Sequence, residues 1–399
     1  MQKFVTLIKN TAFQIILLLI AYLLLTDIIP PVLHRALYSM SLLIKEVLIW
    51  LLPLTIASFI ASSIASFEKK APLFVMSLLV FELFSNLTSV WAAYAGAHSF
   101  SFAYYLSPLS VSNANFTPLF HLSLAKPFWW SSEYGMAAGL IIGAATALLK
   151  SRKLHGFINK SKQTMQWVLT NIFSKLLPIF VLGFFVKTFQ TKLWAQMTQQ
   201  YGMVIFALVI MLILYIALLF FFSAGFSLKR MAFSIKNLMP AGLLALTTGC
   251  SLSTMPWTIK GTSKNLQNPE FAQSVIPATT NIQQIGDCIA NSFLCFLIYY
   301  QYFQYPPSFA TWALFSIMFA LARYATAAIM GGAIFVMLPI YENYLHFNPE
   351  MIALILAFNV LLDPIITSSN VIANGALCRI FEKQWLIISQ GIFKPIKKI

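Results

Sequence analysis

The sequence predicts an all-α polytopic membrane protein. Hydrophobic residues make up 59% of the 399 residues, only 9% are charged, and the mean hydropathy is +0.79. A soluble domain of this length needs far more charge to cover its surface. Apolar runs that reach or approach the ~20 residues of a membrane-spanning helix recur at 12–26, 47–67, 133–149 and 202–222. We therefore expect a bundle of helices embedded in a lipid bilayer.

The net charge of +15 is distributed as in a membrane protein. Lys and Arg collect in cytoplasmic loops, and here they cluster at 150–162, at 229–236 and in the tail from 379 onward. The long 99–132 segment, by contrast, holds only Lys126. This alternation predicts cytoplasmic N- and C-termini in a plasma membrane, which is the inner membrane if the cell is bacterial. No nucleic-acid partner is expected.

The first 223 residues read as consecutive apolar helices. The Ser-, Pro- and aromatic-rich segment at 99–132 interrupts them and is expected to lie along the outer membrane face. The helices are expected at 11–30, 41–67, 72–98, 133–150, 164–188 and 201–223.

After residue 223 the pattern changes, because apolar segments are broken by polar residues, Gly and Pro. The segment 228–264 contains TTGCSLSTMP at 247–256, and 309–340 contains ATAAIMGGA at 325–333. Irregular backbone at membrane depth survives only where protein or a watery cavity satisfies its polar groups. Paired interrupted segments are typical of transporter binding sites. The alternative is a bundle of kinked helices.

The last apolar helix, expected at 350–380, carries a polar stripe. On a helix at about 100° per residue, Asn359, Thr367, Asn370 and Asn374 all fall within about 40° of Asp363. An ionised carboxylate near the bilayer midplane is costly unless it is paired or faces water, so it indicates a functional site. Asn and Thr alone would more often be interhelical contacts. Asp363 can accept an ammonium group, and its neighbours can bind a desolvated cation or a carboxylate.

These motifs resemble those of the dicarboxylate/amino acid:cation symporters, the glutamate-transporter family. The last helix of that family carries D-x-x-R-T-x-x-N-x-x-x-D, and here Asp363, Thr367, Asn370 and Asn374 follow that spacing. The Ser-rich inner hairpin is matched by CSLSTMP at 250–256, the seventh helix by IPATTNIQQIGDC at 276–288, and the outer hairpin tip by ATAAIMGGA. A Leu-Thr-Ser element matches Leu87, Thr88 and Ser89.

The resemblance implies eight transmembrane helices plus two re-entrant helical hairpins, assembled as a homotrimer. Residues 1–223 would form the scaffold and part of a moving transport domain, and 386–399 a basic cytoplasmic tail. The transport core, 224–385, would consist of an inner hairpin (228–264), helix 7 (272–304), an outer hairpin (309–345) and helix 8 (350–380).

The resemblance also implies roles for individual residues. Asp363 would hold the amino group of a substrate, and Ser251 would contact its carboxylate. The other substrate-binding candidates are Thr367, Asn370, Ile366 and Thr326. The cation-binding candidates are Thr88, Ser89, Asn281, Gln283, Asn370 and Asn374.

Departures from the family pattern bear on specificity and coupling. Ile366 stands where acid-specific members carry Arg, which favours a neutral over an acidic amino acid. Asn374 and Ile285 replace two cation-binding carboxylates, and Asp287 lies about 200° from Ile285 on a continuous helix. We hypothesise that the fixed charge of Arg323 substitutes for a lost cation. Alternatively, Arg323 extends its charged end toward the outer interface.

The leading interpretation is a symporter for a small amino acid or a dicarboxylate, coupled to sodium or protons by an elevator mechanism. One alternative is a membrane-embedded lipid-modifying enzyme that uses Asp363 in acid–base chemistry. Another is a degenerate transporter relative without ion coupling. The four cysteines have no metal-ligand spacing, so we expect no cofactor and no metal beyond the coupling ion. No phosphate-binding loop for ATP is present in the sequence.

Overall fold

The computed structural model describes residues 11–65, 72–104, 116–127, 129–149, 151–190, 193–280, 282–325 and 332–392. Every regular element in these ranges is a helix, which confirms the all-α class. The elements up to residue 223 are α2 (Thr11–Leu25), α3 (Pro31–Ala65), α4 (Pro72–Ala103), α5 (Ser132–Leu149), α6 (Arg152–Val168), the π-helical turn η1 (Leu169–Phe173), α7 (Ser174–Gln190) and α8 (Leu193–Ser223).

The later elements are shorter until the last one. They are α9 (Leu228–Thr248), α10 (Ser251–Ser263), α11 (Pro269–Thr279), α12 (Ile285–Phe303), α13 (Phe309–Ala322), the 3₁₀ turn η2 (Arg323–Ala325), α14 (Gly332–Leu345) and α15 (Pro349–Ile392).

Several described helices are long and apolar enough to cross a membrane. They are Met76–Ala103 in α4, Tyr201–Ser223 in α8 and Pro349–Ser389 in α15; the bent pair Arg152–Phe173 and Pro178–Lys187 adds a fourth span if it counts as one. Shorter apolar helices cover Pro53–Ser62, Ala137–Thr146 and Phe309–Ala325. The number of eight spans therefore stays a prediction.

The helix expected at 164–188 differs most from the structure. Its first residues belong to α6, a separate helix that begins at Arg152, and the chain then turns by 56° into α7. The π-helical turn η1 lies at this junction, and Pro178 follows it inside α7. Both features are known causes of sharp helix kinks, since each interrupts the regular hydrogen-bond ladder.

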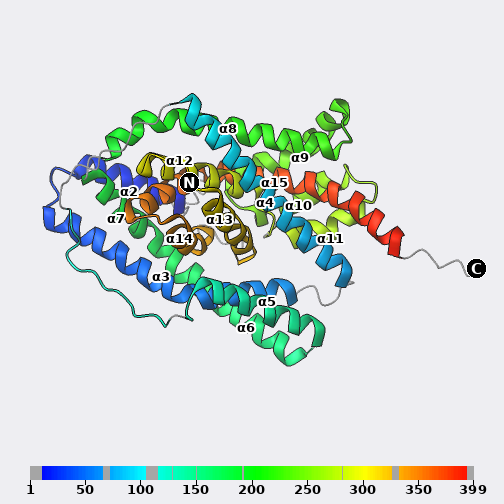
Figure 1. Cartoon of the computed structure of the whole chain (residues 1–399), viewed down its shortest axis with the longest axis horizontal. Coiled ribbons are helices and arrows are strands. Elements are labelled where there is room, and N and C mark those ends of the chain that lie inside the picture. The colour runs from blue at the N-terminus through cyan, green and yellow to red at the C-terminus, as the bar shows by residue number, and fades with distance from the viewer. Residues whose placement is uncertain are drawn as a thin grey trace, which may run out of the picture.

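Helix α15 lies at the centre of the helix bundle. It packs against α7, α8, α9, α10, α11, α12 and α14. In Figure 1, α3, α5 and α6 lie along one side, α8 and α9 lie along the opposite side, and α12 and α15 run between them. Most of α12 is buried, so its polar residues need partners within the protein.

Three breaks interrupt the second half of the chain. Gly249, with φ of 58°, ends α9 in the left-handed conformation that favours glycine, and α10 folds back to pack against α9. The helix expected at 272–304 is two helices, α11 and α12, separated by residues 280–284. Helices α13 and α14 also pack against each other, but most of the predicted outer tip lies outside the described residues.

Helices α3 and α5 approach each other closely through two glycines spaced four apart. A Cβ on Gly135 would lie 2.6 Å from the Pro53 carbonyl oxygen, and one on Gly139 would lie 3.0 Å from the Ala57 oxygen. Small residues at this spacing let the backbones of membrane helices touch.

We predict that Gly135→Ala destabilises the protein by about 1–3 kcal/mol, because the new methyl group meets rigid backbone instead of a movable side chain. Thermal unfolding of the purified protein in detergent measures the change. Gly202→Ala is the matched control, since nothing lies within 4 Å of its Cβ position. Equal melting temperatures for the two variants would contradict the close-contact explanation.

Candidate binding site at the broken helices

Asn370 of α15 satisfies the backbone at the start of α12. Its Oδ1 accepts hydrogen bonds from the N–H groups of Gly286 (2.8 Å) and Asp287 (3.3 Å). The first N–H groups of a helix have no partner within it, and Gln284, at the N-cap position, provides no side-chain cap. The approach is close because Gly286 has no Cβ, which would lie 2.5 Å from the Ile366 oxygen. A side chain from a distant helix therefore takes the place of the local cap.

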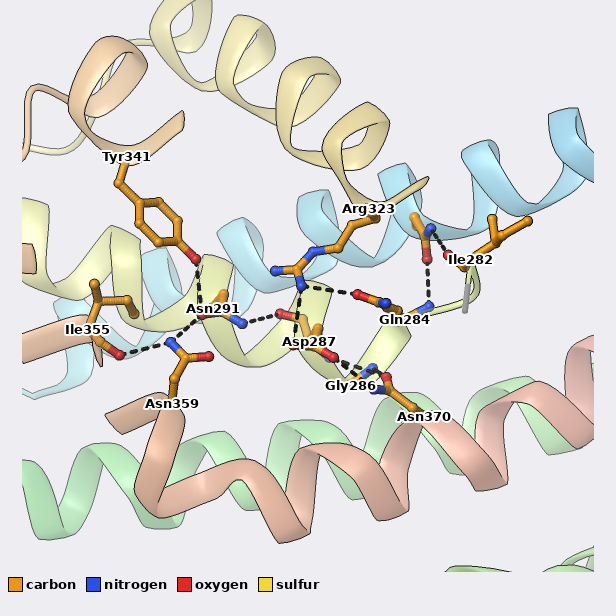
Figure 2. A network of polar contacts seen from close by, with 11 residues as sticks. Ile282, Gln284, Gly286, Asp287, Asn291, Arg323, Tyr341, Ile355, Asn359 and Asn370 are labelled. Atoms are coloured by element: carbon orange, nitrogen blue, oxygen red, sulfur yellow. Dashed lines mark hydrogen bonds and ion pairs between the residues drawn. The ribbon is translucent and has the colours of Figure 1, made fainter. Parts of the chain in front are cut away.

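Asp287 forms a buried ion pair beside this cap. Arg323 Nη1 lies 3.2 Å from Asp287 Oδ1 and also donates to Gln284 Oε1 at 3.1 Å. Asn370 Nδ2 donates to the other carboxylate oxygen, Oδ2, at 2.7 Å. Figure 2 shows Arg323 pointing from the end of its helix toward Asp287 and Gln284, with Asn370 on the far side. Both oxygens of the Asp287 carboxylate are thus hydrogen-bonded inside the protein.

The Arg323 side chain is only 1% exposed. Its guanidinium carbon lies 4.3 Å from the centroid of the Phe319 ring, a cation–π contact. The alternative that Arg323 extends toward the outer interface is therefore wrong, because the guanidinium points into the protein.

The network continues along α12 to two further helices. Asn291 Oδ1 accepts from Asn359 Nδ2 of α15 (2.6 Å) and from Tyr341 OH of α14 (3.1 Å). Its Nδ2 donates to the Asp287 carbonyl at 3.0 Å. This second bridge positions the start of α12 relative to α14 and α15.

Asn86 of α4 bonds backbone groups within the break between α11 and α12. Its Nδ2 donates to the Ile282 carbonyl at 2.9 Å, and its Oδ1 accepts from the Gln284 N–H at 3.2 Å. These bonds hold the two backbone residues on either side of Gln283. No motif predicted a role for Asn86, although it directly precedes the Leu-Thr-Ser element.

A small cavity lies between the α9–α10 hairpin, the α11–α12 break and α15. Its volume is ≈ 10 Å³, enough for about one water molecule or one ion. The lining residues are Ser251, Thr258, Thr280, Gln283, Asn370, Val371 and Asn374. Hydroxyl and amide oxygens are suitable ligands for a hard cation. A molecule of the size of an amino acid does not fit into this volume.

Asp363 lies at the turn of the hairpin. A Cβ on Gly249 would be 3.4 Å from Asp363 Oδ2. The ion pairs among the described residues join Lys45 to Glu342, Lys187 to Glu350 and Arg323 to Asp287, and none of them involves Asp363. The carboxylate therefore faces a turn, without a cationic partner in the described part of the chain.

The predicted site residues fall into groups. Ser251, Gln283, Asn370 and Asn374 line one cavity, and their roles in binding stay predictions. Thr367 and Ile366 are buried on α15 but do not line it, and Ile366 packs in the largest apolar cluster. Asn281 and Thr326 lie outside the described residues.

The α4 candidates lie away from the cavity. Thr88 is exposed, and its hydroxyl donates to the Ser85 carbonyl at 2.9 Å. Ser89 is buried and donates to the Asn86 carbonyl at 2.7 Å. Their predicted role in a cation site stays a prediction.

Ile285 and Asp287 both lie in α12, so the angle of about 200° between them applies. Ile285 packs in the apolar core, whereas Asp287 bonds Arg323 and Asn370. Asp287 does not line the cavity, and its value as a substitute cation ligand stays a prediction. Sequence analysis also missed Gln284, Asn291, Thr258 and Thr280, whose polar side chains in an apolar segment were the available signal.

We predict that Asn370→Ala lowers the free energy of unfolding by about 1–3 kcal/mol, because it leaves buried N–H groups of α12 without an acceptor. Thermal unfolding in detergent measures the loss. Asn171→Ala removes an exposed amide of the same kind and should change the melting temperature little. A loss no greater than that of the control would show that water replaces the Asn370 cap.

Comparisons with known proteins place these helices in a family context. A sequence profile described as the sodium:dicarboxylate symporter family matches residues 136–384, which is more than half of the chain. The matched region contains the cavity, Asp363 and the Asp287–Arg323 ion pair. A comparison with curated proteins found no match.

Proposed function

Since the chain belongs to the sodium:dicarboxylate symporter family, we propose that it carries a small amino acid across the membrane between the α9–α10 hairpin and α15. The family consists of transporters, so the protein is a multi-pass membrane transporter and not an enzyme. The hypothesis of a lipid-modifying enzyme is therefore wrong. No cofactor is needed, because binding and conformational change perform transport.

The observation that carries this proposal is the position of Asp363. It is a half-buried carboxylate in the middle of an apolar helix, beside a hairpin turn, without a cationic partner among the described residues. A charge in such a place is costly, and a bound cation offsets that cost. The ammonium group of an amino acid supplies the cation. Pro364 lacks an N–H, so the Val360 carbonyl lacks its usual helical donor.

The other end of the substrate has a complementary partner. Helix α10 begins at Ser251, directly after the Gly249–Cys250 turn. Free N–H groups at a helix start, together with a serine hydroxyl, suit a carboxylate. An α-amino acid placed between Asp363 and the start of α10 would thus have both charges compensated. The small volume of the cavity next to this turn supports an elevator or gating step that opens the site.

A neutral substrate is favoured over an acidic one. A second carboxylate would need its own cation, and the guanidinium of Arg323 is already paired with Asp287. Ile366 presents no charge, since it packs in the apolar core.

The finer parts of the proposal concern assembly and coupling. We propose eight spans and two re-entrant hairpins in a homotrimer, with 1–223 as scaffold and part of the transport domain and 224–385 as transport core. Both termini would be cytoplasmic. The coupling ion would be sodium or a proton, and the oxygens that line the cavity support a small cation.

We predict that Asp363→Asn raises the half-saturation concentration for uptake into proteoliposomes about 10²- to 10³-fold, because it removes the charge partner of a buried ammonium. Asp27→Asn is the control, since Asp27 lies in an exposed turn. The proposal fails if both variants transport as the wild type does. Equal melting temperatures of the two variants would show that lost uptake is not lost folding.

We also predict that neutral amino acids stabilise the purified protein against heat more than aspartate, glutamate or succinate do. A ligand that binds only the folded state raises the melting temperature by mass action. Stabilisation by succinate but by no amino acid would instead indicate a dicarboxylate carrier in which Asp363 contacts no ammonium group.

A further inference from the structure

We propose that Arg323 is a tethered cation: its guanidinium fills a position at Asp287 that a mobile monovalent cation would otherwise occupy. The wild-type transporter would then bind no free cation at this carboxylate. This inference rests on the proposed transport function and concerns how many ions that function needs.

The groups around the guanidinium are the first support. Arg323 Nη1 is held by a carboxylate oxygen of Asp287 (3.2 Å) and by an amide oxygen of Gln284 (3.1 Å). Carboxylate and amide oxygens are the ligands that hard metal ions take in proteins. Gln284 lies in the break between α11 and α12, and Asp287 lies in the first turn of α12. The position therefore has the chemistry of a cation site, and a positive charge occupies it.

The charge balance is the second support. Side chains from other elements bond the start of α12 or reach it through Asn291. They include Asn86 of α4, Asn370 of α15, Tyr341 of α14 and Arg323 of η2. Among these four, Arg323 is the cation, and the acid that it faces is Asp287. Without the guanidinium, the Asp287 carboxylate would be left buried and uncompensated, a state that recruits either a proton or another cation.

The tether is the third support. Arg323 is nearly fully buried, stacks on Phe319 of the same helix and belongs to the turn that ends α13. A guanidinium attached to the chain has an occupancy that does not depend on the salt outside. An ion pair with only a structural role would also be buried, so the experiment must detect cation binding itself.

The test measures cation binding without any substrate. Wild type, Arg323→Gln and the double variant Arg323→Gln/Asp287→Asn are melted in sodium chloride and in choline chloride at equal ionic strength. We expect sodium to raise the melting temperature of Arg323→Gln by about 3 °C more than that of wild type, at a concentration 100-fold above its dissociation constant. The double variant should lose this extra shift, because it lacks the carboxylate.

A sodium response of Arg323→Gln that is no larger than that of wild type overturns the proposal. If Arg323→Gln does not fold, the single variant Asp287→Asn is compared with wild type instead. Asp287 already binds a mobile ion if sodium raises the melting temperature of wild type but not that of Asp287→Asn, and this result also overturns the proposal. An unchanged response supports the tethered cation. Since no substrate is involved, failed uptake would count against the transport function and leave this result standing.

Discussion

The break between α11 and α12 is the constraint on which the site depends. A helix interrupted inside a membrane protein exposes N–H and C=O groups that lipid cannot satisfy. Here the side chains of Asn370 and Asn86, from helices far away in sequence, bond those groups from two sides. Each amide therefore fixes the break and one neighbouring helix at the same time. Asn370 both accepts the N–H groups at the start of α12 and lines the small cavity, so the cavity lies next to the break.

The two acids near the break have different surroundings and thus different uses. Asp287 has both oxygens bonded, one to Arg323 and one to Asn370, so it is compensated within the chain. Asp363 faces the Gly249 turn and has no cationic partner among the described residues. The compensated acid stabilises the structure of the break, and the uncompensated acid remains available to a ligand. This difference links the buried ion pair to the proposed choice of a substrate with an ammonium group.

Two further ion pairs connect early and late helices. Lys45 of α3 pairs with Glu342 of α14, and Lys187 of α7 pairs with Glu350 of α15 at 2.6 Å. Both cross the boundary proposed between scaffold and transport core. If the transport core moved relative to the scaffold, both ion pairs would have to break. They would therefore stabilise the conformation described here relative to conformations in which the core has moved.

The sequence alone determined the helical membrane class, because apolar composition and run length leave few other solutions. It also predicted the polar stripe on the last helix. The residues Ser251, Gln283, Asn370 and Asn374 came from the family resemblance, and packing brings them to one cavity. Tertiary structure decided the partners of Asp287, the burial of Arg323 and the part played by Asn86. A helical angle tells which residues share a face, but not which distant side chain that face meets. Which distant side chain satisfies the freed backbone depends on packing, which no local pattern encodes.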